Sequence, residues 1–347
     1  MNSETRQSNY DKLPEDHDLI LSYKPRFLNR GGEHLVYTVD GHPDVVIKAS
    51  TYKIKDSVLK IAERGQIDDD TLKSEAENEY TEEIKQKNEE VRNLRIFFGK
   101  EHTLRERRYL MKVPVTQELL EEIFAHDYFK RTLPEIANDI KEVWTHVIVQ
   151  EYTKAPEDPD KISLTYGFFI ENDSPNPQQY QEVTNSIIDS DSQDFDKGKF
   201  LELQDHSKNK SLSQLITLSE SDEQLREQLV YFVLTSIKYA EKTGQILALA
   251  GEDNVLFCKK DDKWNFVLLD ALPNSPDLIF QIMKDLEQKL SQNINLNPEE
   301  IEYLKRGINF VRIINGLAIT LGLSERLKLP NVFSEVNLLN IINGNKL

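Results

Sequence analysis

A glycine pair followed by two strand-like runs is the feature that most limits how this chain can fold. Residues 35–39 and 45–49 are rich in β-branched and apolar side chains, and four turn-forming residues separate them. The pattern predicts a hairpin whose entrance is Gly31 and Gly32. Glycine lets a backbone approach ligand oxygens, and Lys48 on the returning strand can neutralise phosphate charge. Taken alone, however, these residues fit a tight turn with an ordinary strand lysine better than a ligand site.

Length and charge narrow the class of protein. The chain has 347 residues, of which 38% are apolar, so it can bury a sizeable core in one large domain or in two closely joined lobes. Lys and Arg number 43 against 60 Asp and Glu, which gives a net charge of -17. Such an acidic molecule as a whole is a poor electrostatic partner for nucleic acid or an anionic membrane surface. We therefore expect neither partner.

The sequence shows no pattern typical of disulfides, zinc sites, signal peptides or membrane spans. Cys258 is the single cysteine, so no intramolecular disulfide can form, and the seven histidines are scattered without zinc-ligand spacing. The first twenty residues hold no apolar signal region, and no apolar run approaches the length of a membrane span. These features predict a cytoplasmic protein without membrane insertion.

Composition divides the chain into regions. Residues 1–18 are polar and are expected to form a flexible tail, residues 19–155 a first lobe, and residues 156–347 a mostly helical second lobe. Within the second lobe, residues 171–198 are dominated by Asn, Asp, Ser, Gln and Pro, which is typical of a surface insertion.

Hydrophobic periodicity, together with capping and turn-forming residues, predicts the remaining helices and strands. In the first lobe we expect a long charged helix at 68–98, a strand at 103–115, a helical insertion at 117–139 and a buried strand at 147–149. In the second lobe we expect a helix with a Ser221–Gln224 capping box and a C-terminal Gly244, a hairpin at 254–257 and 266–269, and a last helix at 297–322.

Four segments together resemble the protein-kinase-like superfamily. Gly-Gly-Glu-His-Leu-Val-Tyr at 31–37 resembles its glycine-rich loop, although His34 and Asn29 stand where that loop has further glycines. Val-Val-Ile-Lys at 45–48 resembles the strand that bears the ATP lysine. Gly-Glu-Asp-Asn-Val-Leu-Phe at 251–257 resembles the end of the catalytic loop, and Leu-Leu-Asp-Ala-Leu at 268–272 resembles the metal-binding segment. The four segments occur in the family's order.

The resemblance implies a fold and a set of ligands. The expected fold is α+β and bilobal, with a small antiparallel-sheet N-lobe that carries a long helix, and a mostly helical C-lobe. The implied cofactors are ATP and Mg²⁺. Gly31, Gly32, Val36 and Lys48 would then contact the nucleotide, and Asn254 and Asp270 would hold the metal.

Further contacts follow from the same resemblance. Glu90 fits the helical glutamate that orients Lys48, with Glu89, Glu83 and Glu82 as alternatives on a helix rich in charge. Glu151 and Thr153 lie in a segment that resembles the adenine-binding hinge, and a plain strand end fits that segment equally well.

The usual catalytic aspartate is missing. Counting back from Asn254 by the family's spacing places the catalytic trio on Leu247, Ala248 and Leu249, which offer no side-chain base. Asp253 is the nearest carboxylate and the candidate substitute base, while capping of its own loop is the structural alternative. Residues beyond 275 show no Ala-Pro-Glu segment.

Three functions stay open on these residues. The first is a divergent kinase-like phosphotransferase that binds ATP and Mg²⁺, uses an altered catalytic loop and acts on an unknown protein or small-molecule acceptor. The second is a catalytically inactive pseudokinase that acts as a protein-binding scaffold. The third is nucleotidyl transfer to protein hydroxyls.

Overall fold

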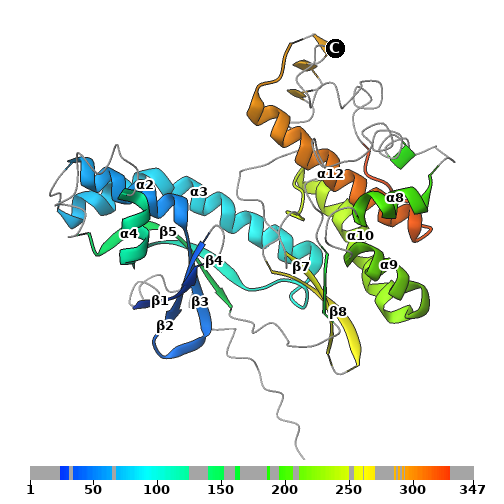
Figure 1. The fold of residues 1–347 in the computed structure, drawn as a ribbon, viewed down its shortest axis with the longest axis horizontal. Helices are drawn as coiled ribbons and strands as arrows, with labels where there is room; N and C mark the ends of the chain where they lie inside the picture. Colours follow the sequence, from blue (N-terminus) through cyan, green and yellow to red (C-terminus); the bar gives the residue numbers. More distant parts are fainter. Residues whose placement is uncertain are drawn as a thin grey trace, which may run out of the picture. The chain divides into compact units, whose positions relative to one another are not determined.

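The computed structural model describes residues 24–30, 34–64, 68–124, 140–151, 161–164, 186–187, 195–205, 211–249, 254–260, 262–269, 285–286, 288–289, 291–292 and 294–328. These residues form two sheets with antiparallel ladders and several long helices, so the expected α+β class is confirmed (Figure 1). The chain divides into two compact units. Unit 1 holds Met1–Glu89 and Arg105–Lys154, and unit 2 holds Glu90–Leu104 and Ala155–Leu347. Residues 90–104, expected in the first lobe, thus belong to unit 2.

Unit 1 is built on a five-stranded sheet in the order β1-β2-β3-β5-β4. The strands are β1 (Pro25–Arg30), β2 (His34–Val39), β3 (His42–Ser50), β4 (Glu106–Pro114) and β5 (Glu142–Glu151). The predicted hairpin is β2 and β3, and Gly41 turns between them with a φ of 79°, a value that glycine adopts without strain. The strand expected at 103–115 is β4, and the strand expected at 147–149 is the second half of β5.

One face of this sheet is the core of unit 1. Because side chains alternate along a strand, Leu35, Tyr37, Ile47 and Ala49 all point to the same face, where they are buried. Helices α2 (Thr51–Arg64) and α4 (Gln117–Phe124) cover that face. Their buried hydrophobic residues include Ile54, Val58, Ala62, Leu119 and Leu120. Only the first eight residues of the expected insertion at 117–139 form α4; residues 125–139 lie outside the described residues.

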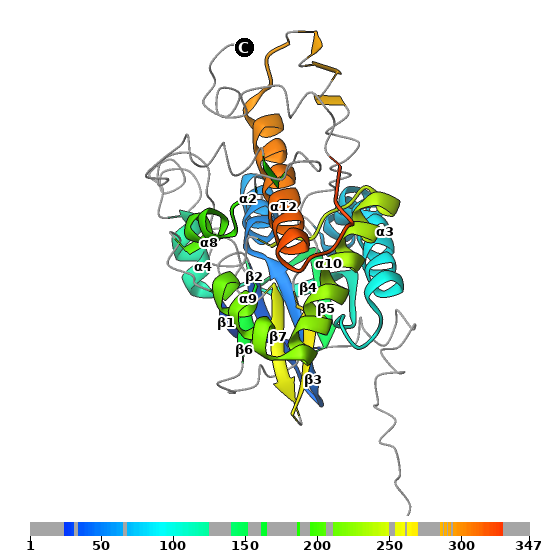
Figure 2. The ribbon, with the colours of Figure 1, turned by 90° about the vertical axis from the view of Figure 1, so that its right-hand side faces the viewer.

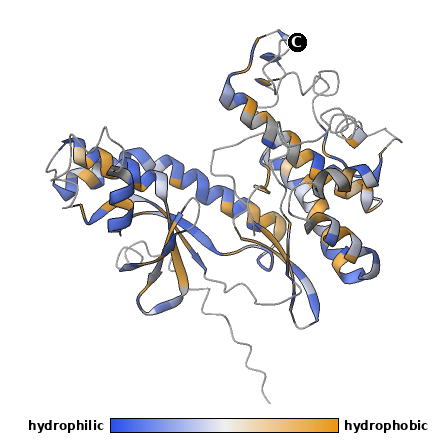
Figure 3. Cartoon of the chain, viewed as in Figure 1, coloured by the Kyte–Doolittle hydropathy of each residue, from blue (hydrophilic) through white to orange (hydrophobic). Residues whose placement is uncertain are grey.

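A 30-residue helix, α3 (Asp69–Phe98), runs from unit 1 into unit 2. Asp68 caps its start, because its Oδ1 accepts the N–H of Thr71 at 2.9 Å. Gly99 ends it with a φ of 85°. The helix predicted at 68–98 is therefore confirmed. Most of its surface is hydrophilic, and hydrophobic residues gather at its C-terminal end (Figure 3). There Val91, Leu94 and Phe98 join the core of unit 2.

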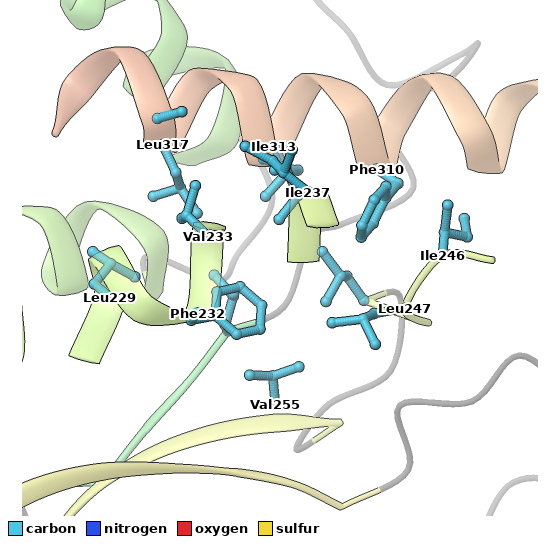
Figure 4. Close-up of a cluster of buried hydrophobic side chains, with 14 of the residues drawn as sticks. Leu229, Phe232, Val233, Ile237, Ile246, Leu247, Val255, Phe310, Ile313 and Leu317 are labelled. Carbon is cyan, nitrogen blue, oxygen red and sulfur yellow. The ribbon is translucent and has the colours of Figure 1, made fainter. Parts of the chain in front are cut away.

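Unit 2 combines a small sheet with helices. Strands β6 (Lys161–Ser163), β7 (Val255–Lys260) and β8 (Lys263–Leu268) pair in that order, and β7 with β8 is the predicted second hairpin. The helices are α8 (Lys197–Asp205), α9 (Ser211–Ser221), α10 (Glu223–Thr243) and α12 (Pro298–Thr320), as Figure 2 shows from the side. Val233 and Ile237 of α10 face Leu317 and Ile313 of α12 across this core, while Phe232 lies on the side of Val255 of β7 (Figure 4).

The helix ends confirm most of the predicted start and stop residues and correct one of them. Gly244 ends α10 in the left-handed conformation, and Asn297 with Glu300 forms a complete capping box at the start of α12. The N-cap of α10, however, is Asp222 and not Ser221. Ser221 is the last residue of α9, and the side chain of Gln224 accepts the backbone N–H of Trp264 instead of returning to the cap.

Part of the expected polar insertion contributes to the core. Ile187 is fully buried in the hydrophobic cluster of unit 2, and Phe195 packs against that cluster. Residues 171–185 and 188–194 lie outside the described residues. The prediction of a purely superficial segment is therefore wrong at Ile187.

Within the described ranges, no helix combines the length and the apolar character that crossing a membrane requires.

Candidate functional site

Lys48 lies on the sheet face opposite the core of unit 1. Strand pairing sets it directly between Val36 of β2 and Ile148 of β5, and Ile148 in turn faces Arg108 of β4. Side chains opposite one another in adjacent strands point to the same face. Val36, Lys48, Ile148 and Arg108 therefore form one row, with a lysine and an arginine on either side of a buried isoleucine.

The ammonium of Lys48 is available for a ligand. The side chain is only partly buried, and within the described part of unit 1 it has no hydrogen bond or ion pair. Arg108, in contrast, is 6% exposed and donates to Glu106 at 3.2 Å, while Gln150 donates to the other oxygen of the same carboxylate. A lysine on a strand with no carboxylate of its own fits a contact to phosphate, which is a strong acceptor.

The other predicted nucleotide contacts of unit 1 are only partly described. Gly31, Gly32 and Thr153 lie outside the described residues. Glu151 ends β5 opposite Val45, and its backbone N–H donates to the carbonyl of Arg105 at 2.9 Å. That N–H is therefore engaged within the unit, as the strand-end interpretation of this segment requires.

In unit 2, Asn254 ties two loop segments to the start of β7. Its side-chain Nδ2 donates to the backbone carbonyl of Ala248 at 2.8 Å, and its backbone carbonyl accepts the N–H of Leu269 at 2.9 Å. The remaining side-chain oxygen, Oδ1, is the kind of neutral oxygen ligand that Mg²⁺ accepts. The chemistry of Asn254 thus fits its predicted metal role. Asp253 and Asp270 lie outside the described residues.

Two of the three positions at which the kinase-like resemblance places a catalytic trio belong to the core. Leu247 and Leu249 are completely buried in the hydrophobic cluster of unit 2, and Figure 4 shows Leu247 beside residues of α10 and α12. Ala248 between them is half-buried and supplies the carbonyl that Asn254 holds. These side chains stabilise the loop by packing and cannot take up a proton.

The glutamates of α3 have partners that the sequence did not indicate. Glu83 accepts from Nζ of Lys53 at 2.5 Å and contacts Nδ1 of His146 at 3.3 Å. These contacts lower the pKa of Glu83 to about 2. The hydrogen bond with His146 has the larger effect, and the one with Lys53 the next largest. Glu90 is buried in unit 2, where its charge adds to the burial that raises the pKa of Tyr239.

Lys53 and His146 were therefore missed. One signal was present: residues 51–64 carry Ile54, Val58 and Ala62 at helical spacing, which predicts a helix directly after the lysine strand and would have brought Lys53 near the sheet. Nothing in the sequence distinguished His146 from a core residue.

Acidic, histidine and cysteine side chains do not gather into a metal-binding group of three or more anywhere in the described ranges. Comparison of the chain with protein-family models, with curated proteins and with solved structures finds no match in any of the three.

Proposed function

We propose that this chain is a divergent kinase-like protein with a bilobal fold that binds ATP together with Mg²⁺. The observation that carries the proposal is the place of Lys48. It lies in the third strand of an antiparallel sheet, pairs with Val36, and leaves its ammonium without a counterion among the described residues of unit 1. In protein kinases the lysine that contacts the ATP phosphates lies on the third strand.

Unit 2 supports the metal half of the proposal. Asn254 immediately precedes β7, its Nδ2 donates to the carbonyl of Ala248, and its Oδ1 has no hydrogen bond to the described residues of unit 2. Together with Asp270, it would supply oxygen ligands to Mg²⁺, whose charge neutralises that of the phosphates.

The buried leucines favour a second candidate function, a pseudokinase scaffold. Leu247 and Leu249 replace any side-chain base with core packing. General-base assistance contributes about a hundredfold to ten-thousandfold to a rate, whereas phosphoryl transfer depends mainly on positioning and charge neutralisation. Loss of the base thus slows transfer without abolishing nucleotide binding, and only turnover separates the two functions.

A thermal-shift titration with Mg²⁺ and ATP tests binding. A ligand that binds only the folded state at about 100 times its Kd stabilises that state by about 2.7 kcal/mol. We expect a rise in Tm for the wild type and for the control Lys85→Ala, whose side chain is 75% exposed, and loss of most of the rise for Lys48→Ala. Equal rises in wild type and Lys48→Ala would contradict the phosphate role of Lys48.

Turnover then assigns the reaction. Labelled ATP is incubated with the protein and candidate acceptors, and the product mass distinguishes transfer of phosphate from transfer of the nucleotide. A robust rate that Asp270→Asn abolishes rules out the scaffold function. If Asp253→Asn leaves that rate unchanged, Asp253 is not the base. Binding without turnover supports the scaffold.

A further inference from the structure

Three charged or titratable side chains of unit 1 meet where α2, α3 and β5 come together. Lys53 is in the first turn of α2, Glu83 lies in the middle of α3, and His146 lies on β5. Nζ of Lys53 lies 2.5 Å from Oε1 of Glu83 and 3.1 Å from Nδ1 of His146, and it also lies over the ring of Tyr80. This cluster joins two consecutive helices to a strand that comes much later in the sequence.

The Nδ1 atom of His146 stands between a cation and an anion. It is 3.1 Å from the ammonium of Lys53 and 3.3 Å from a carboxylate oxygen of Glu83. A ring nitrogen without hydrogen accepts from Lys53, and a ring nitrogen with hydrogen donates to Glu83. It cannot do both. A neutral ring with its hydrogen on Nε2 leaves Nδ1 free to accept from Lys53, whereas a protonated ring carries a hydrogen on both nitrogens, so Nδ1 must then donate to Glu83.

The surroundings of His146 oppose a positive charge on the ring. Its side chain is 5% exposed, so a charged ring would lose most of its contact with water. On the His146 face, Glu83 is the carboxylate that contacts the ring, while Glu106 pairs with Arg108, and Asp69 and Glu142 pair with Lys112. The charged and titratable groups on this face, from α2, α3, β3, β4 and β5, are Lys53, Asp69, Tyr80, Glu83, Lys48, Glu106, Arg108, Lys112 and Glu142.

We infer that Lys53, Glu83 and His146 form an acid-sensitive clamp that is closed when His146 is neutral and releases Lys53 when His146 gains a proton. Lys53 is the group that leaves, because its long side chain is 22% exposed and can reach water, whereas the imidazole is enclosed. Glu83 then keeps protonated His146 as its partner. The first turn of α2 loses its tie to α3 and β5. This inference concerns unit 1 alone and does not depend on nucleotide binding.

The direction of the pH effect follows from the pKa values. Burial lowers the pKa of His146 from 6.5, and Lys53 and Arg108 act in the same direction while Glu83 opposes them. An unfolded chain therefore takes up this proton at a higher pH than the folded one, so the stability that neutral His146 contributes is present above pH 6.5 and is lost as the pH falls below it. Glu83, with a pKa of about 2 instead of 4.5, stays ionised until much lower pH.

Hydrogen exchange of the first half of α2 tests the clamp. Amide exchange of residues 55–58 is followed at pH 7.5 and 5.5 and corrected for the intrinsic rate, with α10 as the internal reference. We expect the opening equilibrium of residues 55–58 to rise about tenfold at the lower pH, because pH 5.5 lies one unit below the ordinary histidine pKa of 6.5, so in the opened state protonated His146 exceeds neutral His146 about tenfold there. The rise should vanish in His146→Gln, and it should persist in His42→Gln, which changes an exposed histidine.

Lys53→Met separates a switch from a merely buried histidine. Without the ammonium, the variant has nothing to release, so opening should be high at both pH values and the pH-dependent rise should disappear. A rise that persists in Lys53→Met or in His146→Gln, or no rise in the wild type, overturns the inference. If His146→Gln does not fold, histidine NMR decides: Lys53→Met must raise the pKa of His146, and an unchanged pKa overturns the clamp.

Discussion

The side-chain amide of Asn88 makes two hydrogen bonds to the backbone of Arg108. Its Oδ1 accepts the N–H of Arg108 at 2.8 Å, and its Nδ2 donates to the carbonyl of the same residue at 3.0 Å. Arg108 lies on β4, the last strand of the five-stranded sheet, so one residue of α3 satisfies backbone groups that another strand would otherwise pair with.

Replacing Asn88 should loosen that edge. Asn88→Ala leaves an N–H and a carbonyl without these partners, and we expect a loss of about 1–2 kcal/mol in the free energy of unfolding. Asn88→Asp, which can accept but not donate, should lose less. Urea denaturation measures both, with Glu82→Ala, a change at a carboxylate 86% exposed, as the control. Equal stability of Asn88→Ala and the control would show that water replaces the amide fully.

The core position of Leu249 predicts that an aspartate at this position damages the protein. Leu249 is fully buried, so Leu249→Asp places a carboxylate in an apolar environment. Burial raises the pKa of that carboxyl, so the stability deficit relative to Leu249→Asn should grow as the pH rises from about 4 to 7. Thermal unfolding across this range checks it. A Leu249→Asp protein as stable as Leu249→Asn at pH 7 would mean that the loop can turn the side chain out to water.

Gly316 should not tolerate even a methyl group. A Cβ added there would lie 2.5 Å from Cε2 of Phe200, a fully buried ring on α8. Although alanine is the better helix former by about 1 kcal/mol, we expect Gly316→Ala to lose about 1–3 kcal/mol through overpacking. In a double-mutant cycle, Gly316→Ala combined with Phe200→Leu should lose less unfolding free energy than the sum of the losses of the two single variants. Additive losses would place the strain elsewhere.

The buried Ile187 divides the polar insertion into parts with different importance. Deleting residues 174–185 removes a polar stretch, and because closure entropy changes slowly with loop length, cooperative unfolding should survive. Ile187→Ala should cost about 2–5 kcal/mol, whereas Leu218→Ala, at a side chain 36% exposed, should cost much less. An Ile187→Ala protein with wild-type stability would contradict its place in the core.

The elements that the sequence predicted well are those whose signals are local. The β2-β3 hairpin follows from alternation around Gly41, and the end of α10 follows from Gly244, because each signal concerns backbone conformation within a few residues. The cap of α10 was misplaced by one residue, since Ser221 and Asp222 are both good caps and α9 continues through Ser221. Choosing between them needs the tertiary contact of Gln224 with Trp264.

The residues of the candidate site divide in the same way. The strand position of Lys48 could be predicted because it follows from the hairpin pattern, and the hairpin register gives its pairing with Val36; its contact with phosphate stays a prediction. The partner of Glu83 could not be predicted, since Lys53 lies 30 positions and His146 lies 63 positions away, and many lysines compete for each glutamate of α3. Only three-dimensional packing selects one pair among these candidates.

The shared helix α3 sets where the chain can be divided. A fragment that ends after Lys154 includes residues 90–104 but not the rest of unit 2, so Val91, Leu94 and Phe98 would lose the partners that bury them. A fragment that starts at Ala155 would lack the ring of Phe98, which packs edge-on against Tyr239 and Phe266. The fragment that starts at Ala155 would therefore have an incompletely filled core, and the fragment that ends after Lys154 would expose an apolar surface that favours aggregation. The two halves are best produced as one polypeptide or mixed during refolding.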